Sequence, residues 1–233
     1  YMSIKLLGKI KDYRGYVVND KYVMNQSYLN TVIGILEHSR KVMTNPTIVH
    51  IVVYWSDGFK SNSLREVLQQ AFKVECPTRK KSISHYDYFY CWVNEYAHSS
   101  RHDALQVKGN HTHLFVVFDV NSNSSRERKP KKICTLLSSL DGVNEAYPQP
   151  RKYGEGVDVS SLPYKQRYLH DLKTEMMDAV NRYCYFAKHE TKLNGRSNIG
   201  YSQIPKPKRP KGRLATNPYQ VAYGDAYYHP SFS

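Results

Sequence analysis

The first quarter of the chain contains two patterns of hydrophobic positions with different periods. Over residues 27–43 the apolar side chains recur at the spacing of a helix, at Leu29, Val32, Ile33 and Leu36. Pro46 then ends the helical pattern, because the residue before a proline disfavours helical backbone. Residues 47–55 are mostly β-branched or apolar, which predicts a buried central strand.

A second helix and two further strands are expected next along the chain. Ser63 and Glu66 have the spacing of a capping box ahead of an apolar helical face, so they predict the start of a helix. Residues 86–98 are rich in aromatic side chains and residues 111–120 are mostly apolar, and both segments predict strands. The polar link between them, residues 99–110, indicates antiparallel neighbours in one sheet.

The second half of the chain alternates charged, irregular and helical segments. We expect a charged loop over residues 122–132, a short apolar segment over 133–140 and irregular structure over 141–163. Residues 163–188 predict the clearest helix, with an apolar stripe at Leu169, Leu172, Met176, Val180, Tyr183 and Ala187. Residues 1–25 are mixed and basic and predict only short strands.

This order of elements predicts an α+β fold with a largely antiparallel sheet. We expect a single domain over residues 1–203, because 233 residues lack the length for a second large module. Residues 204–233 are expected to form a flexible basic tail, since proline and lysine are too dense at 205–211 to pack in a core. Whether the tail binds a partner or is only a solvated terminus stays open.

The charge of the chain points to a polyanionic partner. There are 34 basic and 20 acidic residues, for a net charge of +14. The 21 tyrosines favour single-stranded nucleic acid in particular, because bases stack on aromatic rings while phosphates pair with cations. The alternative is a merely basic protein whose tyrosines lie in its core.

Other features of the composition exclude several classes of protein. No apolar run approaches the length of a membrane span, and the start does not resemble a secretory signal, so we expect a cytoplasmic protein with no membrane partner. No Gly-rich phosphate loop is present, so nucleotide hydrolysis is not expected. The cysteines lack the paired spacing of a zinc site and are expected to be small core residues: Cys76, Cys91, Cys134 and Cys184.

A candidate metal site begins at His111-Thr112-His113, at the start of an expected strand. Alternate residues of a strand face the same way, so both imidazoles would point at one ion. A surface pair without a ligand is the competing interpretation. Glu95, on the expected antiparallel neighbour, could add a carboxylate and complete a two-histidine, one-carboxylate set, although an exposed position or an ion pair would also explain it.

A candidate nucleophile lies near the end of the expected long helix. Tyr185 and Lys188 are three residues apart and would share a helix face, beside the polar Asn181, Arg182 and His189. A metal ion can polarise a phosphodiester while a tyrosine oxygen attacks the phosphorus, and a nearby lysine can favour the phenolate. For any one of 21 tyrosines, packing or base stacking is the commoner role, so only the combination singles out Tyr185.

Together these residues resemble the HUH superfamily of single-strand DNA nicking enzymes, in which a His-hydrophobic-His strand is combined with a Tyr-x-x-Lys helix. The resemblance is greatest to the replication initiators of filamentous phages (the inovirus gene-two family) and their prophage-encoded YagK/YfjJ relatives. Thr112 departs from the hydrophobic middle residue. The matching motifs follow in order between residues 45 and 202: Trp92-Val93-Asn94-Glu95, His111-Thr112-His113, Tyr185-Phe186-Ala187-Lys188-His189-Glu190-Thr191-Lys192 and Arg196-Ser197-Asn198-Ile199-Gly200-Tyr201-Ser202.

The resemblance implies a central antiparallel sheet of about five strands flanked by helices, with the RRM-like core of HUH nucleases. It implies a site for Mg²⁺ or Mn²⁺ with three ligands, Glu95, His111 and His113. Tyr185 would be the nucleophile and Lys188 its helper. DNA contacts are expected from three basic residues of the same region, Arg182, Lys192 and Arg196, while the 122–132 loop and the tail are basic candidates for recognising an origin hairpin.

The implied activity is site- and strand-specific nicking and rejoining of DNA through a covalent 5′-phosphotyrosine, to initiate rolling-circle replication of a phage or mobile element. The expected partners are single-stranded DNA or an origin hairpin, with a separate helicase and polymerase. His189 stands where initiators of icosahedral phages carry a second tyrosine, which favours a single-tyrosine enzyme; Tyr183 lies on the core stripe and is not expected to attack. The alternatives are a relaxase or transposase of the same superfamily, a non-catalytic DNA-binding regulator, and a metal hydrolase.

Overall fold

The structure is a computed structural model that describes residues 5–56, 61–73, 88–95, 110–120, 123–189 and 199–204. Its strands are β1 (Leu6–Leu7), β2 (Asp12–Tyr13), β3 (Tyr16–Val17), β4 (Met24–Asn25), β5 (Pro46–Trp55), β6 (Tyr88–Glu95), β7 (His111–Asp119), β8 (Val143–Pro148), β9 (Leu169–Asp171) and β10 (Ile199–Tyr201). Its helices are α1 (Gln26–Val42), α2 (Ser61–Lys73), α3 (Asn123–Ser138), α4 (Tyr164–Tyr168) and α5 (Met176–Tyr183), with short 3₁₀ turns η1 (Val159–Ser161) and η2 (Cys184–Ala187).

The predicted α+β fold with a central antiparallel sheet is confirmed. The sheet has the strand order β10-β6-β7-β5-β8. Strand β9 pairs with the first half of β5, along the same edge where β8 pairs with the second half. Every pairing in this sheet is antiparallel, including that of β6 with β7, which were the two expected neighbours. β5 is buried along almost its whole length, as its run of β-branched residues predicted.

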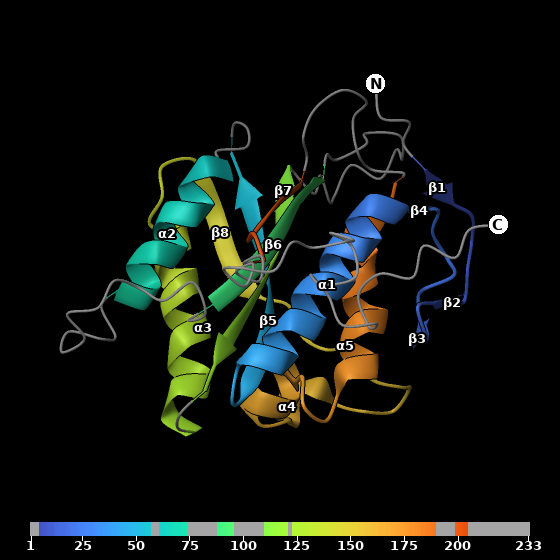
Figure 1. Cartoon of the computed structure of the whole chain (residues 1–233). Coiled ribbons are helices and arrows are strands. Elements are labelled where there is room, and N and C mark those ends of the chain that lie inside the picture. The colour runs from blue at the N-terminus through green and yellow to red at the C-terminus, as the bar shows by residue number, and fades with distance from the viewer. Residues whose placement is uncertain are drawn as a thin grey trace, which may run out of the picture. The chain divides into compact units, whose positions relative to one another are not determined.

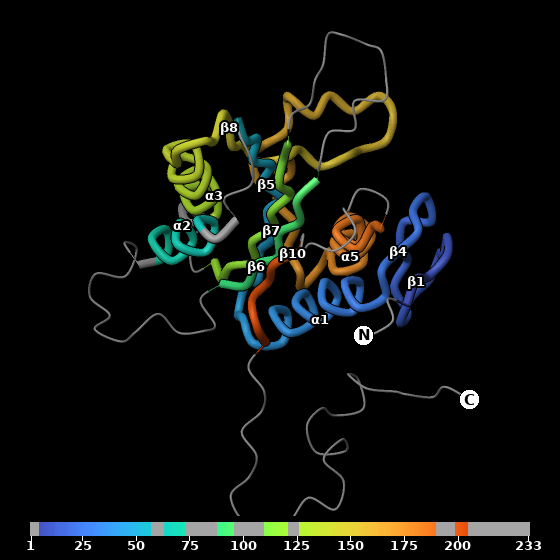
Figure 2. The backbone as a smooth tube through the Cα atoms, turned by 90° about the horizontal axis from the view of Figure 1, so that it is seen from above, coloured from blue at the N-terminus to red at the C-terminus, as the bar shows by residue number. Residues whose placement is uncertain are grey.

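Helices cover both faces of the sheet (Figure 1), and the view from above shows α2 and α3 on one side with α1 and α5 on the other (Figure 2). Alternate side chains of β5 and β7 pack under α2 and α3 in a hydrophobic core that includes Val49, Ile51, Leu114, Val116 and Phe118. The intervening residues of the same strands therefore face α1 and α5. That second face contains the histidines of β5 and β7.

The first helix begins and ends for local reasons. The Asn25 side chain accepts a hydrogen bond from the backbone N–H of Tyr28 and caps the N-terminus of α1. The apolar side chains that predicted the helix, Leu29, Val32, Ile33 and Leu36, are all fully buried. After Val42 the chain turns directly into β5, whose first residue is the expected helix breaker, Pro46.

Three expectations for the middle of the chain are wrong. The charged segment 122–132 is not a loop, because α3 spans Asn123–Ser138 and includes Pro130. Tertiary packing offsets the hydrogen bond that a proline removes, since Ile133 and Leu137 of α3 are buried. Residues 141–163 contain strand β8, and α2 begins at Ser61, ahead of the predicted capping residue Ser63.

The long helix expected over residues 163–188 is broken into several elements. The chain leaves α4 after Tyr168, pairs as β9 with Thr47–Val49 of β5, and forms α5 only from Met176. The backbone N–H of Asp171 donates to the Glu175 carboxylate, which also pairs with Arg151 at 2.8 Å and fixes the turn between β9 and α5. The apolar stripe predicted burial correctly, but pairing with β5 overrode helical propensity.

Several predictions fall on residues outside the described ranges, namely Cys76, Lys192, Arg196, the 99–110 link and nearly all of the tail after Ile204. The remaining cysteines are buried as expected. The N-terminal segment contains the short strands β1–β4, as its sequence suggested. None of the helices within the described ranges is long and apolar enough to cross a membrane.

Candidate active site

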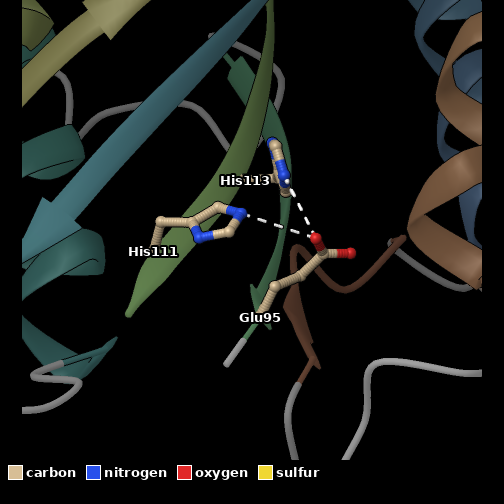
Figure 3. Close-up of side chains that lie close together, drawn as sticks. All are labelled: Glu95, His111 and His113. Carbon is tan, nitrogen blue, oxygen red and sulfur yellow. Dashed lines mark ion pairs between the residues drawn. The ribbon is translucent and has the colours of Figure 1, made fainter. Parts of the chain in front are cut away.

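The three predicted metal ligands come together on the face of the sheet toward α1 and α5. Glu95 is the last residue of β6 and pairs directly with His111, the first residue of β7, while His113 lies two residues along the same face. The Nε2 atoms of His111 and His113 each lie 3.5 Å from Oε2 of Glu95 (Figure 3). The candidate ligand atoms all lie within 4.8 Å of one another, so this group could hold a metal ion.

The protonation states of Glu95 and His113 suit a cation. Burial tends to raise the pKa of Glu95, but hydrogen bonds with His111, His113 and Tyr185 outweigh burial and hold that pKa well below its usual range. Burial lowers the pKa of His113 and keeps its imidazole neutral, against the opposing charge of Glu95. An ionised carboxylate beside a neutral imidazole is the form that binds a metal.

Tyr185 lies against this group, on the 3₁₀ turn η2 and not on an α-helix. Its hydroxyl donates a hydrogen bond of 2.5 Å to Oε2 of Glu95, the same oxygen that faces both imidazoles. Its ring meets His113 edge to face, with the ring centroids 5.3 Å apart. Burial and the negative charge of Glu95 raise the pKa of Tyr185 above its ordinary value, so the phenol keeps its proton in the absence of a cation.

Lys188 lies near Tyr185, as the three-residue spacing suggested. Its Nζ is 5.4 Å from the centre of the Tyr185 ring and 4.7 Å from the centre of the Tyr22 ring. A 3₁₀ turn aligns residues i and i+3, so the change from an α-helix to η2 retains the pairing. Tyr183 is fully buried, in agreement with its place on the core stripe.

The N-terminal segment contributes to the site, and the sequence did not reveal this. The backbone N–H of His189 donates to the carbonyl of Val23 at 2.9 Å, and Met24 forms a β-bridge with Lys188. This pairing brings the Tyr22 ring next to the Tyr185 ring, with the ring centroids 5.6 Å apart. Local patterns cannot show a contact between segments so distant in the chain, and Tyr22 belongs to no motif.

A second missed residue is His50 of β5. Its Nε2 lies 2.9 Å from Nδ1 of His113, while the side chain is buried. Burial is the main reason why the pKa of His50 lies well below its ordinary value, and the nearby His113 and Arg182 lower it further. The signal in the sequence was the single histidine inside an otherwise apolar strand, at a position that alternation places on the same face as Val52 and Tyr54.

The site opens into a cavity of about 840 Å³. Besides Tyr185 and the three candidate metal ligands (Glu95, His111 and His113), its lining includes cationic side chains (Arg151, Lys152 and Arg182) and tyrosines (Tyr22, Tyr54 and Tyr153). Tyr54 also stacks on His111, with the ring centroids 5.5 Å apart, and Tyr147 stacks on Tyr54. A cavity with cations and aromatic rings beside a metal group has the chemistry to accept a nucleotide strand.

The residues predicted to contact DNA lie in different parts of the chain. Arg182 lines the cavity, although its Nη2 also donates to the carbonyls of Gln149 and Pro150. Lys192 and Arg196 lie outside the described residues. Residues 123–132 of the basic segment lie in α3, which packs on the face of the sheet opposite α1 and α5 (Figure 1).

Comparisons of the chain with protein-family models, with curated proteins and with solved structures found no match. A function for this chain can therefore be inferred only from the chemistry of the site itself.

Proposed function

We propose that the protein nicks and rejoins single-stranded DNA through a covalent bond to Tyr185. The observation that carries this proposal is the hydrogen bond from the Tyr185 hydroxyl to Oε2 of Glu95, because that oxygen also faces the two histidines. The nucleophile and the metal group thus meet at one point of a cavity with cationic lining. A hydrolytic metal site needs no tyrosine there, whereas transesterification needs an attacking oxygen at this position.

The proposed reaction conserves the energy of the phosphodiester bond. The Tyr185 oxygen attacks phosphorus, the bond from phosphorus to the 3′ oxygen breaks, and the 5′ phosphate stays on the tyrosine. The tyrosine proton is transferred to the departing 3′ oxygen by way of the groups around it, of which Glu95 is already hydrogen-bonded to the phenol. The charge of Lys188 favours the phenolate, and the reverse reaction rejoins the strand.

The metal proposed for the site is Mg²⁺ or Mn²⁺, held by Glu95, His111 and His113, and it would polarise a phosphate oxygen. Two imidazoles among the ligands favour Mn²⁺ in vitro. The biological role that fits a reversible nick is initiation of rolling-circle replication of a phage or mobile element, with unwinding and synthesis by a separate helicase and polymerase. A relaxase or a transposase would form the same adduct and differ in its DNA site.

The test is a covalent adduct with single-stranded DNA. The full chain is incubated with Mn²⁺ and a labelled single-stranded library of random sequence, and is then run on a denaturing gel. We expect an adduct with the wild type and with Tyr183→Phe, the matched control two residues away, but none with Tyr185→Phe. Peptide mass spectrometry then identifies the modified tyrosine, and sequencing of the attached DNA identifies the site.

The other outcomes separate the alternatives. An adduct that persists in Tyr185→Phe contradicts the assignment of the nucleophile. Cleavage without any adduct indicates a metal hydrolase. DNA binding with neither cleavage nor adduct, in the presence of bound Mn²⁺, indicates a non-catalytic regulator that keeps the fold.

A further inference from the structure

His113 directs its two ring nitrogens at two different groups. Its Nε2 faces Oε2 of Glu95 at 3.5 Å, and its Nδ1 faces Nε2 of His50 at 2.9 Å. The first contact lies inside the candidate metal group, and the second lies behind it, in the interior. A histidine can bind a metal ion only through a nitrogen that carries no proton, so the two contacts are linked.

We propose that His50 is a positioning residue, which accepts a hydrogen bond from Nδ1–H of His113 and so presents the Nε2 lone pair of His113 to the metal ion. The inference rests on the proposed function only as far as the metal site is concerned. It concerns neither the nucleophile nor the DNA.

The tautomers of the two rings follow from the geometry. When a metal ion takes the Nε2 lone pair, the proton of neutral His113 must be on Nδ1, and this N–H points at Nε2 of His50. His50 then accepts through Nε2 and carries its own proton on Nδ1. That Nδ1 atom is buried and has no hydrogen-bond partner among the described residues, so no group on the far side of His50 determines which of the two rings donates. A metal ion on Nε2 of His113 therefore determines it.

The surroundings of His50 hold its ring in place. The side chain extends from the central strand β5, which pairs with β7 over nine residue pairs from Pro46↔Asp119 to Tyr54↔His111. Aromatic rings pack around it, with centroids 5.5 Å away for Phe186 and 6.0 Å away for Tyr183. A buried ring with so little freedom can orient a ligand, and hydrogen-bonding partners of ligand histidines commonly set the affinity for the metal.

The experiment measures the affinity for Mn²⁺ by calorimetry, without DNA. His50→Phe keeps an aromatic ring and removes the acceptor, so we expect binding to weaken by roughly 10- to 100-fold. His50→Gln keeps an oxygen acceptor near the position of Nε2, and its affinity should return close to that of the wild type. His170→Phe is the matched control, because it replaces another buried histidine, on strand β9, and should leave the affinity unchanged.

Unchanged affinity in a folded His50→Phe would overturn the inference and leave the proposed function standing, whereas a wild type that binds no Mn²⁺ would overturn both. A second measurement does not depend on the folding of a variant. Nitrogen NMR of the Mg²⁺-loaded wild type should show the proton of His113 on Nδ1. An unprotonated Nδ1 in the loaded protein would contradict the inference.

Discussion

At the scale of single residues, the side chain between the two candidate ligands has its own structural role. Thr112 is fully buried and points to the face opposite the histidines. Its hydroxyl accepts a hydrogen bond from the indole of Trp55 at 2.8 Å and donates to Oδ1 of Asn94 at 2.7 Å. One hydroxyl thus joins β5, β7 and β6 directly beneath the site, which accounts for a polar residue at this buried position.

Replacing Thr112 by valine should destabilise the fold and spare the metal site. Valine has a similar shape but cannot accept from the buried Trp55 indole, and an unsatisfied buried donor costs about 1–3 kcal/mol. Urea denaturation should show a loss of that size in the free energy of unfolding, with unchanged affinity for Mn²⁺. Thr47→Val is the control, because this buried threonine makes only a 3.4 Å hydrogen bond. Equal losses in the two variants would contradict the role given to Thr112.

At the scale of elements, the edge strand β10 depends on a residue without a side chain. Gly200 pairs with Trp92 of β6. A Cβ atom added at Gly200 would lie 2.3 Å from the Trp92 ring, far closer than two non-bonded carbon atoms can approach each other. The glycine therefore lets the tryptophan ring lie over the neighbouring strand, so the Trp-x-x-Glu segment and the segment after the Tyr-x-x-Lys motif pack together.

Gly200→Ala should loosen the edge of the sheet. The methyl group must displace a large ring, and overpacking of this kind typically costs about 1–3 kcal/mol. Thermal unfolding should show a lower midpoint than that of the wild type. Gly8→Ala, where no atom lies within 4 Å of the added Cβ, should unfold like the wild type. A normal midpoint for Gly200→Ala would mean that the ring can move without cost.

Local sequence patterns predict some elements of this fold and miss others. Strong periodicity located α1 and β5 to within a few residues, and alternation placed His111 and His113 on one face. The same periodicity failed over residues 163–188, because Leu169–Asp171 pair with β5 and no local signal reports a distant partner strand. It failed again at α3, where charges and Pro130 concealed a helix that tertiary packing stabilises.

In the candidate site, too, local patterns could predict some residues and not others. The metal group follows from two strands that are close in sequence, so Glu95, His111 and His113 could be brought together from alternation and the antiparallel pairing alone. Tyr22 and His50 could not be identified in this way. Tyr22 reaches the site through the pairing of the N-terminal segment with η2, and the role of His50 depends on which ring nitrogen faces His113.

At the scale of the whole molecule, the two faces of the sheet have different chemistry. The face under α2 and α3 is a continuous hydrophobic core. The face toward α1 and α5 buries histidines beside arginines, and burial, followed by the charges of Arg151 and Arg182, lowers the pKa of His170 to about 3. A histidine that stays neutral in the folded state connects stability to pH.

We expect the protein to lose stability as the pH falls below neutral. The ordinary pKa of histidine is 6.5, so below that pH the unfolded chain binds a proton at His170 that the folded chain excludes down to about pH 3. For this residue alone, the free energy of unfolding should fall by about 2 kcal/mol between pH 7 and pH 5. Urea denaturation at both pH values should show a smaller fall in His170→Phe; an equal fall would contradict the assignment.

The β-bridge between Met24 and Lys188 also affects when the site can assemble during synthesis and folding. Tyr185 meets Glu95 across 90 residues, and Asn19 meets Cys184 across 165. Contacts with such long separations form late in folding, because loop closure must be completed before they stabilise the chain. During synthesis on a ribosome the metal ligands emerge well before the tyrosine turn and the N-terminal segment can meet. A nascent chain would therefore hold Glu95, His111 and His113 before Tyr185 can reach them, and the proposed attack on DNA would have to wait until η2 has been synthesised and has paired with the N-terminal segment.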